Sequence, residues 1–599
     1  MYSPVLSLPK VEVRPPALRP IRPLRFVHVL WAGWLLTMAA CVGFFTDLLC
    51  RNLVDIPVVD DITTMFEFTV RYREQHTVPG KLALIFARHG MMEHRLGMMK
   101  LLILAQLQQI GRIDFYGLAM MGNAFILPLL ALLLVVYRRL NRSYLYALPV
   151  FLLLFQPQLL PFGMLWCNAA MLYVPVSFFC LLGLWLLVRP GRWALAGAMA
   201  SLAVALLIFS NALLVMPMML LVLLVQRRFR ALALMAGWQG LLVALYLLDY
   251  QKSAATQPPA LRNVPLYGRN LLALTGSLLD QGNPLNNSQL YGSMAAGLAV
   301  TLVFGWLVWT WWRHDGRSWL NITRFAGLSG RFGRGTGYRP DPQAPLRLFL
   351  LSGYLYLFAL MLVIALFRVA DDGSVGFLFR ARYKINAVLL LILSYYTLLL
   401  LSPYRYRQVI AAGATLLTGG LLLFSYHWTI PLITYDRHKY QIGATNYQQT
   451  GRWQIYDDIP GYETYVQRWT DQAVRAGLYA FPKDAFGRLP ARSPQLSRLT
   501  TTEQRDAFWI TGDTYRVSPA ADERICLVAQ AGGQVVLVPV LGNRSARRGW
   551  PFNGSAFRAG FAGRLPKAYL QPGRLYRLGV YVYRKGVATI SYHAQPVRF

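Results

Sequence analysis

Charged residues are scarce in this chain. Of its 599 residues, only 14% are Asp, Glu, Lys or Arg, against about 25% in a soluble domain, while 55% are apolar. Such a composition cannot be solvated as a single globule, which excludes a soluble enzyme. Intrinsic disorder is excluded as well, because large apolar and aromatic residues are plentiful. The composition therefore predicts a polytopic helical membrane protein with an extramembrane domain attached.

Cysteines and nucleotide-binding motifs are also rare or missing. Five cysteines are too few for a disulfide-built secreted fold, and no Cys-x-x-Cys pair exists for a zinc site of that type. Cys50 and Cys167 both fall near the outer ends of predicted spans, so one disulfide is conceivable. The glycine-rich run Gly330–Gly337 lacks the strand and helix of a nucleotide-binding fingerprint, and no Walker motif is present, so ATP-driven transport has no support.

Acidic residues are outnumbered by basic ones. The chain has 60 Lys and Arg against 26 Asp and Glu, a net charge of +34. A basic balance alone suggests nucleic acid. Here much of the excess lies in short segments between apolar runs, which is how membrane proteins orient themselves. We therefore expect no nucleic-acid partner, and the surplus charge suits anionic lipid headgroups or a lipid-phosphate substrate.

Apolar runs of the length that crosses a bilayer, about 20 residues, occur eleven times. If these spans alternate in direction, the Arg clusters all fall on one side, which the positive-inside rule assigns to the cytoplasm. We expect a multi-pass protein of the cytoplasmic (inner) membrane with a cytoplasmic N-terminus and an extracytoplasmic C-terminal domain. The eleven runs are 27–49, 117–137, 143–161, 171–188, 193–209, 211–226, 231–249, 291–312, 347–368, 385–401 and 408–428.

The expected fold class is an all-α polytopic membrane protein with a small extracytoplasmic domain at its C-terminal end. Short alternating runs separated by Gly or Pro predict that this domain is an antiparallel β-sandwich. A helix is expected near 461–478, in the segment before it. The predicted regions are a basic cytoplasmic tail (1–26), a membrane domain (27–428) with an outer loop (50–116), an extracytoplasmic connector (429–512) and a β domain (513–599).

Two adjacent carboxylates, Asp60 and Asp61, stand just after the first span. Placing carboxylates this close to a membrane costs free energy, unless they have a functional role or pair with a cation. One hypothesis makes the pair a general base, or a ligand for Mg²⁺ or Mn²⁺, facing a lipid-linked substrate. The other is that Asp61 simply caps the helix that follows, a position at which Asp is favoured. The sequence leaves both open.

Further polar clusters lie in two other outer segments. Glu93, His94 and Arg95 precede an amphipathic stretch, Leu96–Ile110, which predicts a helix lying along the membrane surface. The triplet belongs either to a site or to a solvated loop with an internal ion pair. The late outer segment carries cations against the positive-inside trend, which favours a phosphate clamp or headgroup anchoring. Its residues are Arg380, Arg382, Tyr383 and Lys384.

Several of these segments together carry a family resemblance. The Asp-Asp after the first span, the run Arg88-His89-Gly90-Met91-Met92-Glu93-His94-Arg95 and the Arg382-Tyr383 pair before a late span are similar to a group of bacterial multi-span proteins related to the GT-C superfamily of membrane glycosyltransferases. The better match covers roughly residues 40–130. One departure is Met92, where that group often carries Asn.

The resemblance implies a GT-C-like fold with its active site on the outer face and a polyprenyl-phosphate sugar donor. Asp60 or Asp61 would be the base that activates an acceptor hydroxyl. Arg382 and Lys384 would hold the lipid phosphate, and Glu93 and Arg95 would shape the site. The acceptor would be a glycan, a lipid or a protein in the cell envelope.

Three functions follow as hypotheses. The first is sugar transfer from a polyprenyl-phosphate carrier on the outer face of the membrane. The second is transport or flipping of a lipid-linked glycan, which needs charged residues along a path through the spans. The third is a non-catalytic role in cell-envelope assembly, with which Met92 is compatible.

Overall fold

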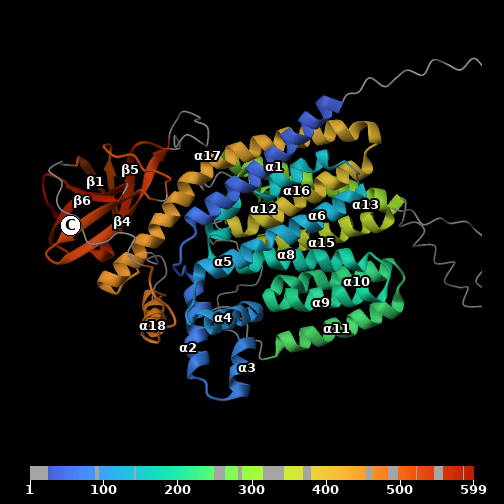
Figure 1. Cartoon of the computed structure of the whole chain (residues 1–599), viewed down its shortest axis with the longest axis horizontal. Coiled ribbons are helices and arrows are strands. Elements are labelled where there is room, and N and C mark those ends of the chain that lie inside the picture. Colours follow the sequence, from blue (N-terminus) through green and yellow to red (C-terminus); the bar gives the residue numbers. More distant parts are fainter. Residues whose placement is uncertain are drawn as a thin grey trace, which may run out of the picture.

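A long helical body with a β domain at one end makes up the computed structural model of this chain (Figure 1). Nine helical segments of the described residues are long and apolar enough to cross a membrane, and two shorter apolar helices coincide with the two remaining predicted spans. The chain is therefore a multi-span membrane protein. The structure describes residues 24–87, 94–140, 143–248, 263–280, 287–313, 343–367, 379–453, 462–482, 497–520, 522–544, 557–584 and 586–598.

Most helices of the body run in roughly the same direction (Figure 1). Their bounds are α1 (Leu24–Asn52), α2 (Glu67–Glu74), α3 (Val78–Phe86), α4 (Gly97–Ile110), α5 (Phe115–Ala124), α6 (Ile126–Leu140), α7 (Leu148–Leu154), α8 (Cys167–Leu187), α9 (Arg192–Ile208), α10 (Val215–Val225), α11 (Phe229–Leu247), α12 (Val264–Thr275), α13 (Asn287–Trp311), α15 (Ala344–Phe367), α16 (Ala381–Leu401), α17 (Tyr404–Thr450) and α18 (Tyr462–Arg475).

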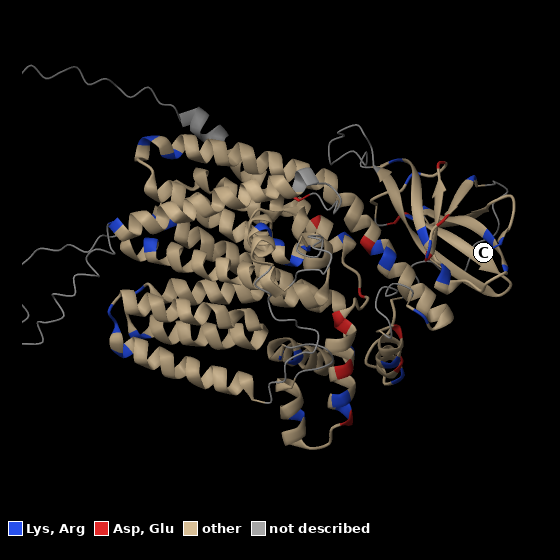
Figure 2. Cartoon of the chain, turned by 180° about the vertical axis from the view of Figure 1, so that it is seen from behind, with Lys and Arg blue, Asp and Glu red and all other residues tan. Residues whose placement is uncertain are grey.

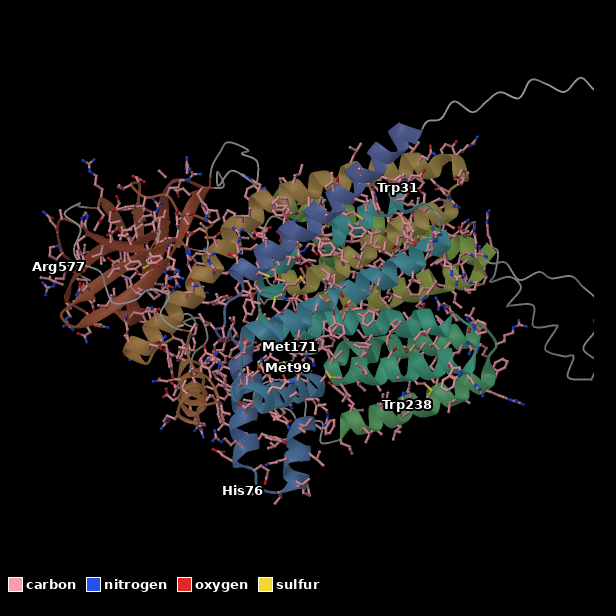
Figure 3. The ribbon with its side chains drawn as sticks, viewed as in Figure 1. Trp31, His76, Met99, Met171, Trp238 and Arg577 are labelled. Carbon is pink, nitrogen blue, oxygen red and sulfur yellow. The ribbon has the colours of Figure 1, made fainter. Side chains whose placement is uncertain are left out.

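The predicted outer loop folds into helices rather than coil. After the π-helical turn η1 (Ile62–Phe66), α2 and α3 run across the direction of the spanning helices (Figure 1). Thr77 caps α3 by accepting a hydrogen bond from the Gly80 N–H. The helix predicted over Leu96–Ile110 is present as α4. Met99, on its predicted apolar face, is buried inside the helical body, as is Met171 of α8 (Figure 3), whereas Ile110 is 52% exposed.

One span is broken at the end that leads into α8, and the break builds part of the site. The apolar segment Tyr144–Met164 leaves helical geometry at Pro161 and at Phe162, which has a φ of +47°. Proline has no N–H to donate, so within a helix it removes a hydrogen bond and favours a kink or a break. The chain then enters α8, which crosses α5 where Gly122 faces the carbonyl of Ala170; a Cβ there would lie 2.5 Å from that oxygen. This close crossing holds the broken segment in place.

The β domain is one antiparallel sheet of eight strands that curls around its own apolar core. The strand order is β1-β2-β5-β4-β3-β6-β7, with β8 paired to β6. It begins at Leu499, earlier than the predicted boundary of 513, because β1 buries little besides that leucine and so has weak alternation. The strands are β1 (Leu499–Glu503), β2 (Ala507–Gly512), β3 (Arg524–Ala531), β4 (Gln534–Arg544), β5 (Phe557–Pro566), β6 (Leu575–Arg584), β7 (Val587–Tyr592) and β8 (Val597–Arg598).

A single helix of 47 residues, α17, joins the two parts and ends where Gly451 adopts a φ of +71°. Asn446 on α17 binds the main chain of Leu537 in β4 in both directions, donating at 2.9 Å and accepting at 3.0 Å. Ile442, one turn earlier, packs into an apolar cluster with Val528 and Leu537. The β domain is therefore docked on the end of α17. Arg577 lies on its far side (Figure 3).

Candidate functional site

Asp61 is completely buried and acts as a structural acceptor. One carboxylate oxygen accepts from the Val58 N–H, and the other accepts from the Asn168 N–H in the first turn of α8, both at 2.9 Å. Burial raises the pKa of Asp61 well above its usual range, and the two N–H donors oppose that rise. Asp61 is thus a cap, as one hypothesis held, but the helix it caps is α8 and not the one that follows it.

Asp60 has a different environment, although it is adjacent. It is half-buried, and its carboxylate lies close enough to Arg382 to interact with it electrostatically. The preceding Val59 has a φ of +41°, a left-handed conformation that is unusual for a β-branched residue. Strain of this kind persists only where surrounding contacts over-determine it, and it clusters at functional sites. One such contact is the Tyr462 hydroxyl, which donates to the Val59 carbonyl at 3.1 Å.

Arg382 lies in the first turn of α16 and is held among aromatic rings. Its guanidinium is 5.2 Å from the ring centroid of Trp166 and 5.1 Å from that of Tyr383. The indole N–H of Trp166 donates to the Val58 carbonyl at 3.0 Å. Trp166 thereby connects Arg382 with the turn that carries Asp60 and Asp61, so segments far apart in sequence converge at one place.

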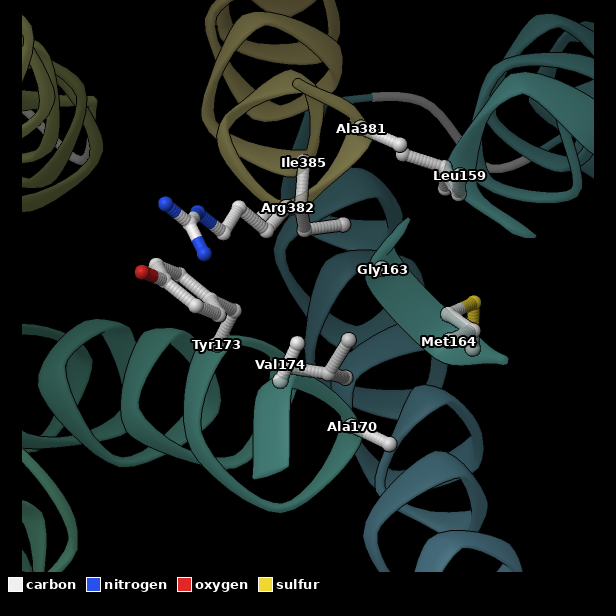
Figure 4. Close-up of a pocket in the computed structure, with 10 residues that line it drawn as sticks. Leu159, Gly163, Met164, Ala170, Tyr173, Val174, Ala381, Arg382 and Ile385 are labelled. Atoms are coloured by element: carbon white, nitrogen blue, oxygen red, sulfur yellow. The ribbon is translucent and has the colours of Figure 1, made fainter. Parts of the chain in front are cut away.

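A small, partly open pocket lies beside Arg382. Figure 4 shows the Arg382 guanidinium and the Tyr173 hydroxyl directed to the same side of it. The rest of the lining is mostly apolar and comes from α8, α16 and the broken span; it includes Leu159, Met164, Ala170, Val174 and Ile385. Such a lining suits a hydrocarbon chain, and the Arg and Tyr at one edge suit a polar head.

The other cations of the late outer segment do not share one environment. The Arg380 guanidinium lies 5.2 Å from the ring centroid of Phe162; burial and the neighbouring charge of Arg382 lower its pKa. Lys384 is buried in an ion pair, 2.9 Å from the Asp280 carboxylate, and also donates to Gln158 at 3.2 Å. Lys384 therefore holds α16 in place inside the helical body instead of facing the pocket.

The predicted triplet divides between structure and site. Glu93 lies outside the described residues. Arg95 binds two main-chain carbonyls, those of Tyr246 at 2.7 Å and Phe86 at 2.8 Å, and so ties α11 to the end of α3. His94 is half-buried, and its Nδ1 is hydrogen-bonded to the Ser210 hydroxyl at 2.7 Å.

A chain of aromatic rings joins His94 to the pocket. The ring of His94 is 4.5 Å from that of Phe209, which is 5.5 Å from Tyr173, which in turn is 5.9 Å from Tyr383. His94, Tyr383 and Arg382 therefore belong to one continuous region. Lys384 and Arg95, by contrast, are engaged in anchoring contacts.

Part of the C-terminal connector covers the turn that carries Asp60. The predicted helix is α18, which packs against η1 and α2. The Tyr465 hydroxyl donates to the Glu67 carboxylate, and Arg71 pairs with that carboxylate at 2.7 Å. A second carboxylate, Asp55, accepts from the Phe115 N–H at 2.7 Å, and burial raises its pKa to about 6. These contacts hold in place the helices on either side of the turn that carries Asp60.

The adjacent carboxylates do not fit a two-Asp cation site. Both oxygens of Asp61 face N–H donors, whose positive ends would repel a metal ion. Across the described part of the chain, no group of three or more His, Cys, Asp and Glu side chains is arranged to hold a metal. The five cysteines are unpaired, so the conceivable disulfide between Cys50 and Cys167 is not formed.

Sequence reasoning missed the aromatic half of this site. Aromatic residues are common in apolar runs and do not by themselves indicate a site there. This applies to Trp166, Tyr173 and Phe209. One signal was present: Pro161 and Gly163 interrupt an apolar run just before Trp166, which is where a span would break. Asp280 and Gln158 carried no such signal.

Comparison of the chain with known protein families, curated proteins and solved structures gives no match. The geometry described above is therefore the basis for a functional proposal.

Proposed function

We propose that the chain is a membrane glycosyltransferase that moves a sugar from a polyprenyl-phosphate donor to a glycan, lipid or protein hydroxyl at the outer face of the cytoplasmic membrane. The observation that carries this proposal is the proximity of Asp60 to Arg382 beside a largely apolar pocket. A base and a phosphate clamp must face the same reacting bond.

Each part of the site has a chemical role in this proposal. The pocket between α8 and α16 takes the first part of the prenyl chain, and Arg382 holds the phosphate with charge-assisted hydrogen bonds. Asp60, which lies near that guanidinium, accepts the proton of the acceptor hydroxyl as that oxygen attacks the sugar carbon. The bond from that carbon to the phosphate oxygen breaks, and the polyprenyl phosphate leaves with the electron pair.

The test is Asp60→Asn, assayed by sugar transfer from a radiolabelled polyprenyl-phosphate donor in membranes. Asn keeps the shape of the side chain but cannot take the proton, so we expect transfer to fall by about 10²-fold or more with the fold intact. Asp47→Asn is the matched control: it removes an outer carboxylate that is paired with Arg51 and lies away from the pocket. Unchanged transfer in Asp60→Asn would remove this mechanism.

A second function has one specific observation in its favour. The ion pair between Lys384 and Asp280 is buried among membrane helices, and buried charges there often mark transport paths. Transport of a lipid-linked glycan would survive Asp60→Asn and fail in Asp280→Asn. A non-catalytic assembly role would be unaffected in both variants, because it does not depend on sugar-transfer chemistry. The same pair of variants therefore separates all three functions.

A further inference from the structure

The junction between α17 and the β domain contains a buried cation whose donors are largely unused. Arg437 on α17 is only 3% exposed. Its Nη2 donates to the carbonyl of Ala520 at 2.9 Å, in the segment that leads into β3, and also contacts His438 Nε2 at 3.2 Å. Arg437 thus already bridges the long helix and the β domain through one nitrogen.

The other two nitrogens of Arg437 differ from Nη2. Among the residues that the structure describes, neither Nε nor Nη1 has a hydrogen-bond partner, although both are enclosed. Together they carry three of the five N–H donors of the guanidinium. A buried guanidinium with most of its N–H donors unbonded costs free energy, because burial removes the water that solvated those donors and no acceptor replaces it. Such a group needs an acceptor.

The charges around Arg437 increase this need. Arg524 of β3 is close enough to repel Arg437 electrostatically, so a second cation lies near the junction. Of the acids nearby, Glu523 is paired with Arg584 at 3.2 Å. Asp522 attracts Arg437 from an exposed position but does not reach the two idle nitrogens. Among the described residues, no carboxylate hydrogen-bonds the two idle nitrogens of Arg437.

We propose that an oxyanion of the phosphate type binds at this junction, between Arg437 and Arg524. A phosphate group presents several acceptor oxygens and negative charge, which suits planar guanidinium donors. Its binding would supply acceptors to the idle donors of Arg437, place negative charge between the two cations and bridge α17 to β3. The β domain would then be locked to the membrane domain by an anion, in addition to the contacts of Asn446. The source is either free phosphate or the headgroup of an anionic lipid.

The test uses the full-length protein and inorganic phosphate as the probe. Thermal unfolding is followed by tryptophan fluorescence in phosphatidylcholine nanodiscs, with potassium chloride added to match ionic strength. We expect a saturable rise in Tm with phosphate. Arg437→Gln should weaken the apparent phosphate affinity by about 10- to 100-fold, the equivalent of one lost charge-assisted contact. Arg437→Lys keeps the charge but loses the planar donors, and gives an intermediate affinity in a protein that stays folded.

Two further arms identify the source and control for charge. Arg584→Gln removes a nearby positive charge that is already paired, and should leave the phosphate response unchanged. A rise in Tm with phosphatidylglycerol in place of phosphatidylcholine, and none with free phosphate, would assign the site to a lipid headgroup. Three results would overturn the proposal. The first is a Tm that changes with neither phosphate nor phosphatidylglycerol, and the second is a phosphate affinity of Arg437→Gln equal to that of wild type. The third is an Asp522→Asn variant whose Tm falls as much as that of Arg437→Gln and does not change with phosphate.

Discussion

At the scale of single residues, the two neighbouring aspartates have different surroundings. The difference depends on Asn168, which lies 107 positions after Asp61 in the chain. Asp61 turns inward to that N–H, while Asp60 remains half-buried near Arg382. Chemically identical residues thus acquire different roles from contacts that no local pattern records.

The capping role of Asp61 predicts a loss of stability. Asp61→Ala leaves two buried N–H groups without acceptors, at roughly 1–3 kcal/mol each, so we expect about 2–6 kcal/mol of destabilisation. Asp61→Asn keeps one acceptor and should cost less. Thermal unfolding of the purified protein measures both. Asp47→Ala, which breaks only an exposed pair with Arg51, should stay within about 1 kcal/mol of wild type. Equal losses in Asp61→Ala and Asp47→Ala would contradict the capping role.

Asp55 predicts a pH dependence with a definite sign. Burial raises its pKa to about 6, above the ordinary value of 3.8, so folding favours the protonated carboxyl. Its contribution to stability is full below about pH 4 and is lost as the pH rises through 6. Comparing Tm for wild type and Asp55→Asn from pH 4 to pH 7 should show the wild type declining relative to the variant. A constant difference would mean that Asp55 is ionised throughout.

At the scale of elements, the spans were predictable and their faces were not. Length and hydropathy alone locate a membrane helix, so nine predicted runs recur as candidate spans. The first turn of α16 shows what is missing: Arg382 points to the pocket, while Lys384, two residues on, points to Asp280. Rotation of a helix about its axis is decided by packing, which hydropathy does not encode. The resemblance assigned both cations to one phosphate, and only Arg382 lies beside the pocket.

The Lys384 ion pair predicts a specific pattern in a double-mutant series. Lys384→Met leaves the Asp280 carboxylate buried without its partner, so we expect a loss of about 3–5 kcal/mol. Adding Asp280→Leu removes the orphaned charge and should restore most of that loss, because two apolar residues replace the pair. Thermal unfolding of the two single variants and the double variant measures the coupling. Additive losses would show that the pair does not act as a unit.

At the scale of the whole molecule, charge is distributed along the axis of the helical body. The ends of the spanning helices far from the β domain carry Lys and Arg, whereas both signs gather toward the β domain (Figure 2). This asymmetry agrees with the Arg clusters of the sequence and leads us to propose a cytoplasmic far end. The β domain would then lie outside, together with Asp60 and Arg382.

Reporter fusions test this orientation. A fusion after residue 142 should report the cytoplasm, because it follows the Arg-rich end of α6, and a fusion at the C-terminus should report the exterior. An alkaline phosphatase reporter, active only outside, and a fluorescent protein, bright only inside, give opposite signals at each position. A cytoplasmic signal from the C-terminal fusion would invert the topology and move the proposed site to the wrong side for a polyprenyl-phosphate donor.

The contact between Tyr462 and Val59 has a consequence for the order of events during synthesis. The two residues are separated by 403 positions, yet the tyrosine braces the turn that carries Asp60. At about 5–20 residues per second, the ribosome needs roughly 20–80 s to reach Tyr462 after Val59 has emerged. During that interval the turn lacks its outer support. This site is therefore complete only after synthesis has reached the last quarter of the chain.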